Sequence, residues 1–120
     1  MLSVAGPHAI PVSTAVRLGD DRLAFALGRG RDTLERLRSD PQVALCLLGT
    51  EVAFTAYGSA AVLREPLESA PVVGVGLDVE SVQDHLADAR TEMLDGARWR
   101  WLDAQAAGAD PKIAAELSGL

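Results

Sequence analysis

The stretch VAFTAYGSAAVL, residues 52–63, decides the fold class of this chain of 120 residues. Val52 and Phe54 alternate along it with Thr55 and Tyr57. A period of two places alternate side chains on opposite faces, which is typical of a half-buried antiparallel strand. The stretch therefore predicts a long strand in an antiparallel sheet.

The segments on either side of this stretch also have the character of strands. Val43–Leu48 is an almost continuous apolar run of strand length, and Gly49–Glu51 supplies a turn between the two. Further on, apolar residues alternate over Val73–Val79 and predict another strand. Beyond Val79 the spacing fits either a helix or a strand continued through a bulge, and we favour the strand.

The first part of the chain predicts three short strands in a meander. Leu2–Ala5 forms the first, an extended stretch over His8–Leu18 forms the second, and Leu23–Leu27 forms the third. Gly6-Pro7 and Gly19–Asp21 provide the turns between them.

An early helix is predicted after the third strand. Asp32 and Glu35 have the spacing of a capping box, and Leu34 and Leu37 lie on one face. Pro41 prevents the helix from continuing. These signals predict a short helix over about Thr33–Ser39.

The end of the chain predicts a second helix. Asp110 followed by proline has the order of an N-cap and a first helical residue, so a short helix is expected over Pro111–Leu117. Before it, Trp99 and Trp101 would share a face in an extended segment, and we favour that conformation. The whole chain, residues 1–120, then forms one mainly β domain with six strands and two helices.

Composition and charge limit the classes of function. Aromatic residues make up only 4% of the chain, so the core must consist of smaller apolar side chains, which suits a compact barrel. The net charge of −6 argues against binding to nucleic acid or to an anionic membrane, because such partners require a cationic surface.

Cysteine usage and hydropathy predict a soluble protein of the cytoplasm. Cys46 is the single cysteine, which excludes an internal disulfide, and its apolar surroundings in the sequence favour buried packing. The chain shows no signal peptide and no apolar run near the roughly 20 residues that span a bilayer.

Three segments resemble a known family when taken in order. PHAIPVS at residues 7–13, LRSDPQVAL at 37–45 and AYGSA at 56–60 are similar to segments of the pyridoxamine-5'-phosphate-oxidase-like split barrels. The resemblance covers about residues 3–82. It implies a six-stranded antiparallel split β-barrel with one short helix after the third strand and a C-terminal helix, working as a homodimer.

The resemblance also implies a flavoprotein. Members of the family hold FMN, or alternatively the deazaflavin F420, in a groove at the dimer interface. When the family's cofactor site is carried over by position, the flavin ring lies along the second strand. The cofactor phosphate then lies at the turn before the early helix. The cofactor-binding residues implied in this way are His8, Ile10, Pro11, Val12, Ser13, Phe25, Ala26, Arg29, Arg31 and Thr33.

The turn before the early helix has both favourable and unfavourable features for a phosphate. Its glycines and arginines, over Gly28–Arg31, supply amide donors and positive charge, although the same residues are equally typical of a solvated surface turn. Asp32 and Thr33 stand where cofactor-binding members usually carry Arg or Lys. A carboxylate there repels phosphate, and an Asp32 that caps the helix would occupy the amides that a phosphate would use.

Two functional hypotheses follow from the sequence. The first is a flavin- or deazaflavin-dependent oxidoreductase acting on a small molecule. Because the cofactor carries the hydride or electron chemistry, no catalytic residue can be assigned from the sequence, and no metal site is expected. The alternative is a noncatalytic dimeric module that kept the barrel and lost its cofactor.

Overall fold

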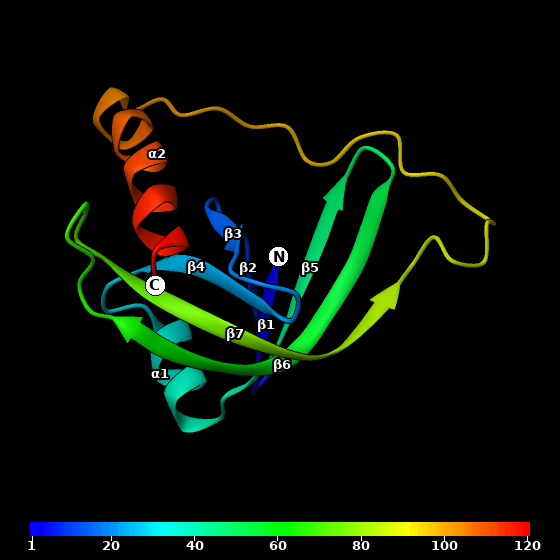
Figure 1. Cartoon of the computed structure of the whole chain (residues 1–120), viewed down its shortest axis with the longest axis horizontal. Helices are drawn as coiled ribbons and strands as arrows, with labels where there is room; N and C mark the ends of the chain where they lie inside the picture. Colours follow the sequence, from blue (N-terminus) through cyan, green and yellow to red (C-terminus); the bar gives the residue numbers. More distant parts are fainter.

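The computed structural model describes all of residues 1–120 as one antiparallel sheet and two helices (Figure 1). The strands are β1 (Leu2–Val4), β2 (His8–Ile10), β3 (Ala15–Arg17), β4 (Arg22–Gly28), β5 (Gln42–Gly49), β6 (Val52–Arg64) and β7 (Val72–Asp84). The helices are α1 (Asp32–Ser39) and α2 (Ala104–Ser118). Neither helix is long and apolar enough to cross a membrane.

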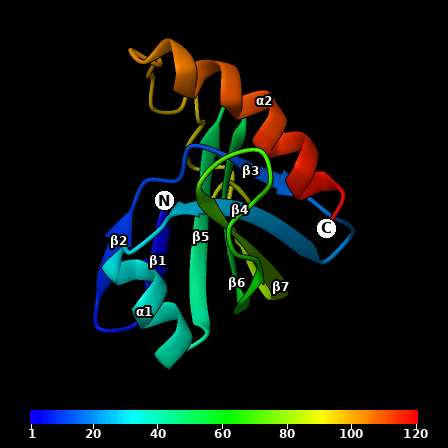
Figure 2. The same ribbon diagram turned by 90° about the vertical axis from the view of Figure 1, so that its left-hand side faces the viewer.

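The order of the strands requires the sheet to curl. The order is β2-β1-β5-β6-β7-β4-β3, so β2 and β3 are consecutive in the chain but form opposite edges. In a flat sheet these edges would lie about 29 Å apart, since six strand spacings separate them. The five residue steps from Ile10 to Ala15 reach at most about 18 Å. The sheet therefore bends until its edges approach each other, and residues 11–14 cross the seam between them (Figure 2).

The predicted strand over His8–Leu18 is wrong, and so is the meander built on it. The structure divides this stretch into β2, which pairs with β1, and β3, which pairs with β4. Pro11 has no N–H to donate to a ladder, and the chain leaves the sheet there. The mainly β class and the antiparallel half-barrel are confirmed, with seven strands in place of six.

The long strands β6 and β7 form the centre of the sheet, with a bulge between them. Tyr57 pairs with Ser81 and Gly58 pairs with Val79, so Glu80 has no opposite residue. Through this bulge β7 continues to Asp84, as the favoured interpretation of the sequence predicted.

The main core fills the concave side of the curled sheet. Phe25 on β4, Leu45 on β5 and Val75 on β7 are almost completely buried in it, and Leu34 and Leu37 of α1 pack against them. The apolar face of α1 is thus buried, as the sequence predicted. Phe25 is the one aromatic residue that is fully buried in this core.

The start of α1 differs from the predicted capping box. Arg31 occupies the N-cap position and makes no side-chain capping bond. Asp32 is the first helical residue, and its carboxylate accepts a hydrogen bond from Arg36 Nε at 2.7 Å. A charged partner one turn away in the helix holds Asp32 on the outer surface, away from the amides that it was expected to cap.

The C-terminal helix α2 starts seven residues earlier than predicted. Asp103 is its N-cap and accepts hydrogen bonds from the amides of Gln105 and Ala106. Pro111 lies inside the helix, and Asp110 instead accepts a hydrogen bond from the Thr14 hydroxyl near the seam. Two Asp-based start signals occur in this region, and the alanine-rich stretch after Asp103 makes the earlier one effective.

Residues 85–103 connect β7 to α2 without helix or strand, and we call this segment the strap. It runs out from the sheet and returns across the end of the β5–β6 hairpin (Figure 1). There the amide of Glu51 donates to the carbonyl of Met93 at 2.9 Å. Trp99 and Trp101 stand edge to face, with ring centroids 5.1 Å apart. The two rings therefore lie on the same side of the segment, as the sequence predicted.

Candidate functional site

A hollow of about 200 Å³ lies at the seam of the barrel, and we call it the seam hollow. One wall is the chain that crosses between the edge strands, and the other is the end of β4 with the turn that follows. Its lining residues are Ile10, Pro11, Val12, Ser13, Ala26, Leu27, Gly28 and Arg31. The structure thus brings six of the ten sequence-predicted cofactor residues together: Ile10, Pro11, Val12, Ser13, Ala26 and Arg31.

Uncompensated positive charge marks one end of the seam hollow. The Arg31 side chain lies against Gly28, where an added Cβ would come 3.0 Å from Arg31 Nε. Five ion pairs are present in the molecule, and neither Arg29 nor Arg31 takes part in any of them. No carboxylate lines the hollow. In a chain of net charge −6, this hollow is therefore a favourable place for an anion.

Asp32 lies near this end, but its carboxylate is already paired with Arg36. The hydrogen bond from Arg36 lowers the pKa of Asp32 and outweighs the opposing effect of desolvation, while the charge of Arg36 and the nearby His8 lower it slightly further. Arg36 also donates to the carbonyl of Gly6 at 2.6 Å, which fixes the pair against the β1–β2 turn. The expected repulsion of a phosphate by Asp32 is therefore reduced, and its carboxylate does not occupy the helix amides.

Four of the predicted residues do not line the seam hollow. His8 Nε2 is 2.9 Å from Thr33 Oγ1, and the Thr33 side chain is buried, with its residue only 1% exposed. Phe25 is completely buried in the main core, and Arg29 points into solvent from the turn. Thr33 is thus engaged by His8 in this structure, while the contacts predicted for these four side chains stay predictions.

A second hollow, which we call the apolar hollow, adjoins the first. Its volume is about 330 Å³, and it shares Pro11 and Val12 with the seam hollow. The remaining lining residues come from the start of the chain, β5 and the strap: Met1, Ala15, Leu45, Cys46, Leu47, Leu48, Ala97 and Trp99.

Sequence reasoning found the apolar hollow only in part. It predicted an extended segment around Trp99, but it assigned Cys46 to buried packing. Cys46 is in fact half-buried and lines the hollow. No sequence signal pairs β5 with the strap, because the strap returns to the sheet through contacts between residues far apart in the chain.

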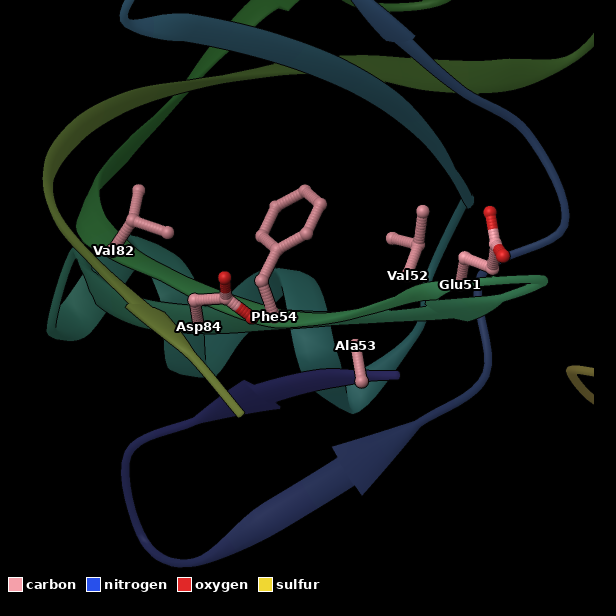
Figure 3. A pocket seen from close by; sticks show the side chains of 6 residues that line it. All are labelled: Glu51, Val52, Ala53, Phe54, Val82 and Asp84. Carbon is pink, nitrogen blue, oxygen red and sulfur yellow. The ribbon is translucent and has the colours of Figure 1, made fainter. Parts of the chain in front are cut away.

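A third, shallow hollow of about 350 Å³ lies at the open end of β6 and β7. Val52, Phe54 and Val82 point to one side there, while Ala53 points to the other (Figure 3). Glu51 and Asp84 place two carboxylates at this hollow. It therefore disfavours an anionic ligand, in contrast to the seam hollow.

The curled antiparallel sheet, with its seam and the helix α1 after β4, defines a split β-barrel. Two solved structures share this fold. A candidate pyridoxamine 5'-phosphate oxidase from Listeria innocua is 16% identical, with a TM-score of 0.57, and the match covers 70% of this chain and 85% of that one. HupZ from Group A Streptococcus is 10% identical, with a TM-score of 0.59, and the match covers 80% of this chain and 86% of HupZ. No protein-family model and no curated protein sequence matches the chain.

The site offers binding groups and no built-in acid–base machinery. Its polar groups are the Arg31 guanidinium, the Ser13 hydroxyl and the backbone amides around Gly28. No cluster of three or more His, Cys, Asp or Glu side chains in the molecule could hold a metal ion. What these residues can do is bind an anionic group at one end and an apolar surface at the other.

Proposed function

We propose that this protein binds a phosphorylated flavin, FMN, or alternatively the deazaflavin F420, in the seam hollow, and uses it for oxidation or reduction of a small molecule. One observation carries the proposal: an Arg31 side chain without an acidic partner lies beside apolar side chains in the seam hollow of a split barrel. The likeness to the Listeria innocua protein supports it at the level of fold.

The lining residues fit such a cofactor in a defined orientation. The guanidinium of Arg31 suits two-point contact with a phosphate, and the absence of a side chain at Gly28 lets Arg31 lie against the backbone there. Pro11 and Val12 present an apolar surface for a flat ring, and Ser13 adds a hydroxyl at its edge. When bound, FMN or F420 supplies the hydride or electron transfer, while the protein orients it and limits access of water.

We further propose that the working form is a homodimer in which a second copy completes the site. The seam hollow alone, at about 200 Å³, is below the roughly 300–1,000 Å³ of small-molecule sites. Large apolar side chains also remain exposed on the central strands, among them Val52 and Tyr57 of β6. Such exposed apolar surface favours association.

Replacement of Arg31 tests the cofactor site. FMN, and in a separate titration F420, should raise the melting temperature of the parent protein, because a ligand that binds only the folded state stabilises it. Arg31→Ala should weaken cofactor binding by about 10- to 100-fold, as expected for a lost charge-assisted hydrogen bond. The matched control is Arg29→Ala, which removes the same charge from a position outside the hollow and should change the affinity by a smaller factor.

The same measurements decide against the proposal if they fail. A purified protein that is colourless, and that neither FMN nor F420 stabilises, would instead support the noncatalytic dimeric module. Equal losses of affinity in Arg29→Ala and Arg31→Ala would place the phosphate outside the seam hollow. A visible spectrum and mass spectrometry of the molecules released on denaturation identify any cofactor that is purified with the protein.

A further inference from the structure

We propose that the apolar hollow is a binding site for a flat, uncharged aromatic or heteroaromatic molecule, held against Trp99 of the strap. None of the side chains that line the hollow carries a charge, and they come from three separate parts of the chain. The site is distinct from the seam hollow, where Arg31 favours an anion.

Size and shape favour a small molecule as the occupant. A volume of about 330 Å³ falls within the range of small-molecule sites, and the hollow is concave. The lining side chains offer a charged ligand no partner, because they are apolar apart from the thiol of Cys46, and the α-ammonium of Met1 already donates to the carbonyl of Cys46 at 2.9 Å. The indole of Trp99 is 58% exposed, so a ring can still cover much of its surface.

The strap places Trp99 at the hollow through two contacts with the β5–β6 hairpin. Met93 accepts the hydrogen bond from the Glu51 amide. Three residues later, Gly96 lies so close to the hairpin that an added Cβ would come 2.5 Å from the carbonyl oxygen of Leu48. Trp99 lies three residues after Gly96, and its edge-to-face contact with Trp101 orients the ring. The position of Trp99 is thus determined by the backbone of the strap.

The two hollows lie next to each other, because Pro11 and Val12 line both of them. A ring in the apolar hollow would therefore lie next to a cofactor ring placed on the other side of these residues. The identification of this occupant as the substrate rests on the proposed function. The existence of the binding site does not, because its lining is complete without a cofactor.

Binding of N-phenyl-1-naphthylamine to the full-length protein tests the inference without any cofactor. This probe is aromatic, is uncharged at neutral pH and fluoresces when it leaves water. We expect saturable fluorescence enhancement and, at saturation, alkylation of Cys46 by N-ethylmaleimide that is at least severalfold slower. Cys46 is the single cysteine, so the labelling rate reports on this hollow alone.

Two pairs of variants localise the probe. Trp99→Ala should weaken its binding about tenfold through loss of a stacking surface, whereas Val82→Ser in the third hollow should leave it unchanged. Gly96→Val should also weaken binding, because its side chain would push the strap away from Leu48. Gly49→Ala is the matched control, since an added Cβ there meets no atom within 4 Å.

Three results would overturn the inference. They are the absence of saturable binding, equal affinity in the parent and Trp99→Ala, and protection of Cys46 that depends on protein concentration instead of probe, which would assign the hollow to a second copy of the chain. Failure of FMN or F420 to bind is a separate result that removes the proposed function and leaves this binding site standing.

Discussion

Gly58 shows how a single residue sets the geometry of the central strands. An added Cβ at this position would come 1.9 Å from the carbonyl oxygen of Asp78 and 2.9 Å from its carbon. The close approach occurs beside the bulge at Glu80, where β7 passes tightly over β6. Only a residue without a side chain allows the two backbones to pair here.

We therefore expect Gly58→Ala to destabilise the fold by about 1–3 kcal/mol, because the strands must separate to admit the methyl group. Gly49→Ala should change the stability by less than about 1 kcal/mol, since open space surrounds that position. Urea denaturation followed by circular dichroism measures both values. Equal stability of the two variants would show that the strands adjust to a methyl group at the bulge without cost.

At the scale of elements, α2 is joined to the loop between β6 and β7 through Glu116. Its carboxylate accepts hydrogen bonds from the amides of Glu68 and Ser69, from the Ser69 hydroxyl and from Arg64. Desolvation acts to raise the pKa of Glu116, but these hydrogen bonds outweigh it and lower the pKa from 4.5 to about 2. The ionised carboxylate therefore stabilises the packed position of α2.

This shift predicts a pH dependence of stability. Between pH 4.5 and about 2 the unfolded chain binds a proton at Glu116 that the folded chain does not, so the free energy of unfolding falls as the pH falls through this window. The contribution is fully present above pH 4.5. Glu116→Gln should lower the urea midpoint at pH 7 and flatten its change between pH 4.5 and 2.

Glu92→Gln is the control for this experiment, because Glu92 is an exposed strap residue and takes part in none of the side-chain hydrogen bonds of the molecule. It should retain the pH dependence of the parent protein. If Glu116→Gln also retained it, acid sensitivity would have to come from other carboxylates.

At the scale of the whole molecule, closing the sheet creates the candidate site. The two edges of the sheet are joined by residues 11–14, and both the seam hollow and the apolar hollow are lined by Pro11 and Val12 from this connection. Thr14, in the same connection, is held by Asp110 of α2. The C-terminal helix therefore supports the chain that forms the site.

The proposed homodimer predicts a concentration-dependent mass. Sedimentation equilibrium should give a species of twice 12.6 kDa at micromolar concentrations, and FMN should increase its fraction, because a ligand that contacts both copies favours their association. A monomer that binds FMN with unchanged affinity across protein concentrations would show that one chain is sufficient for the site.

The sequence by itself determined the local features of this protein. Alternation in residues 52–63 and 73–79 identified the central strands, and the apolar stripe of Leu34 and Leu37 identified α1, because side-chain periodicity reports directly on which face is buried. The resemblance to a known family located six residues that line the seam hollow. These properties depend on neighbours in the chain.

Only the tertiary structure decided how distant parts meet. The break at Pro11 that sends β2 and β3 to opposite edges, the pairing of Asp32 with Arg36 instead of the helix amides, and the start of α2 at Asp103 were each predicted differently. The apolar hollow depends on β5 and the strap, which lie about 50 residues apart in the sequence. Local patterns report burial, whereas edge pairing and long-range contacts are selected by the packing of the whole chain.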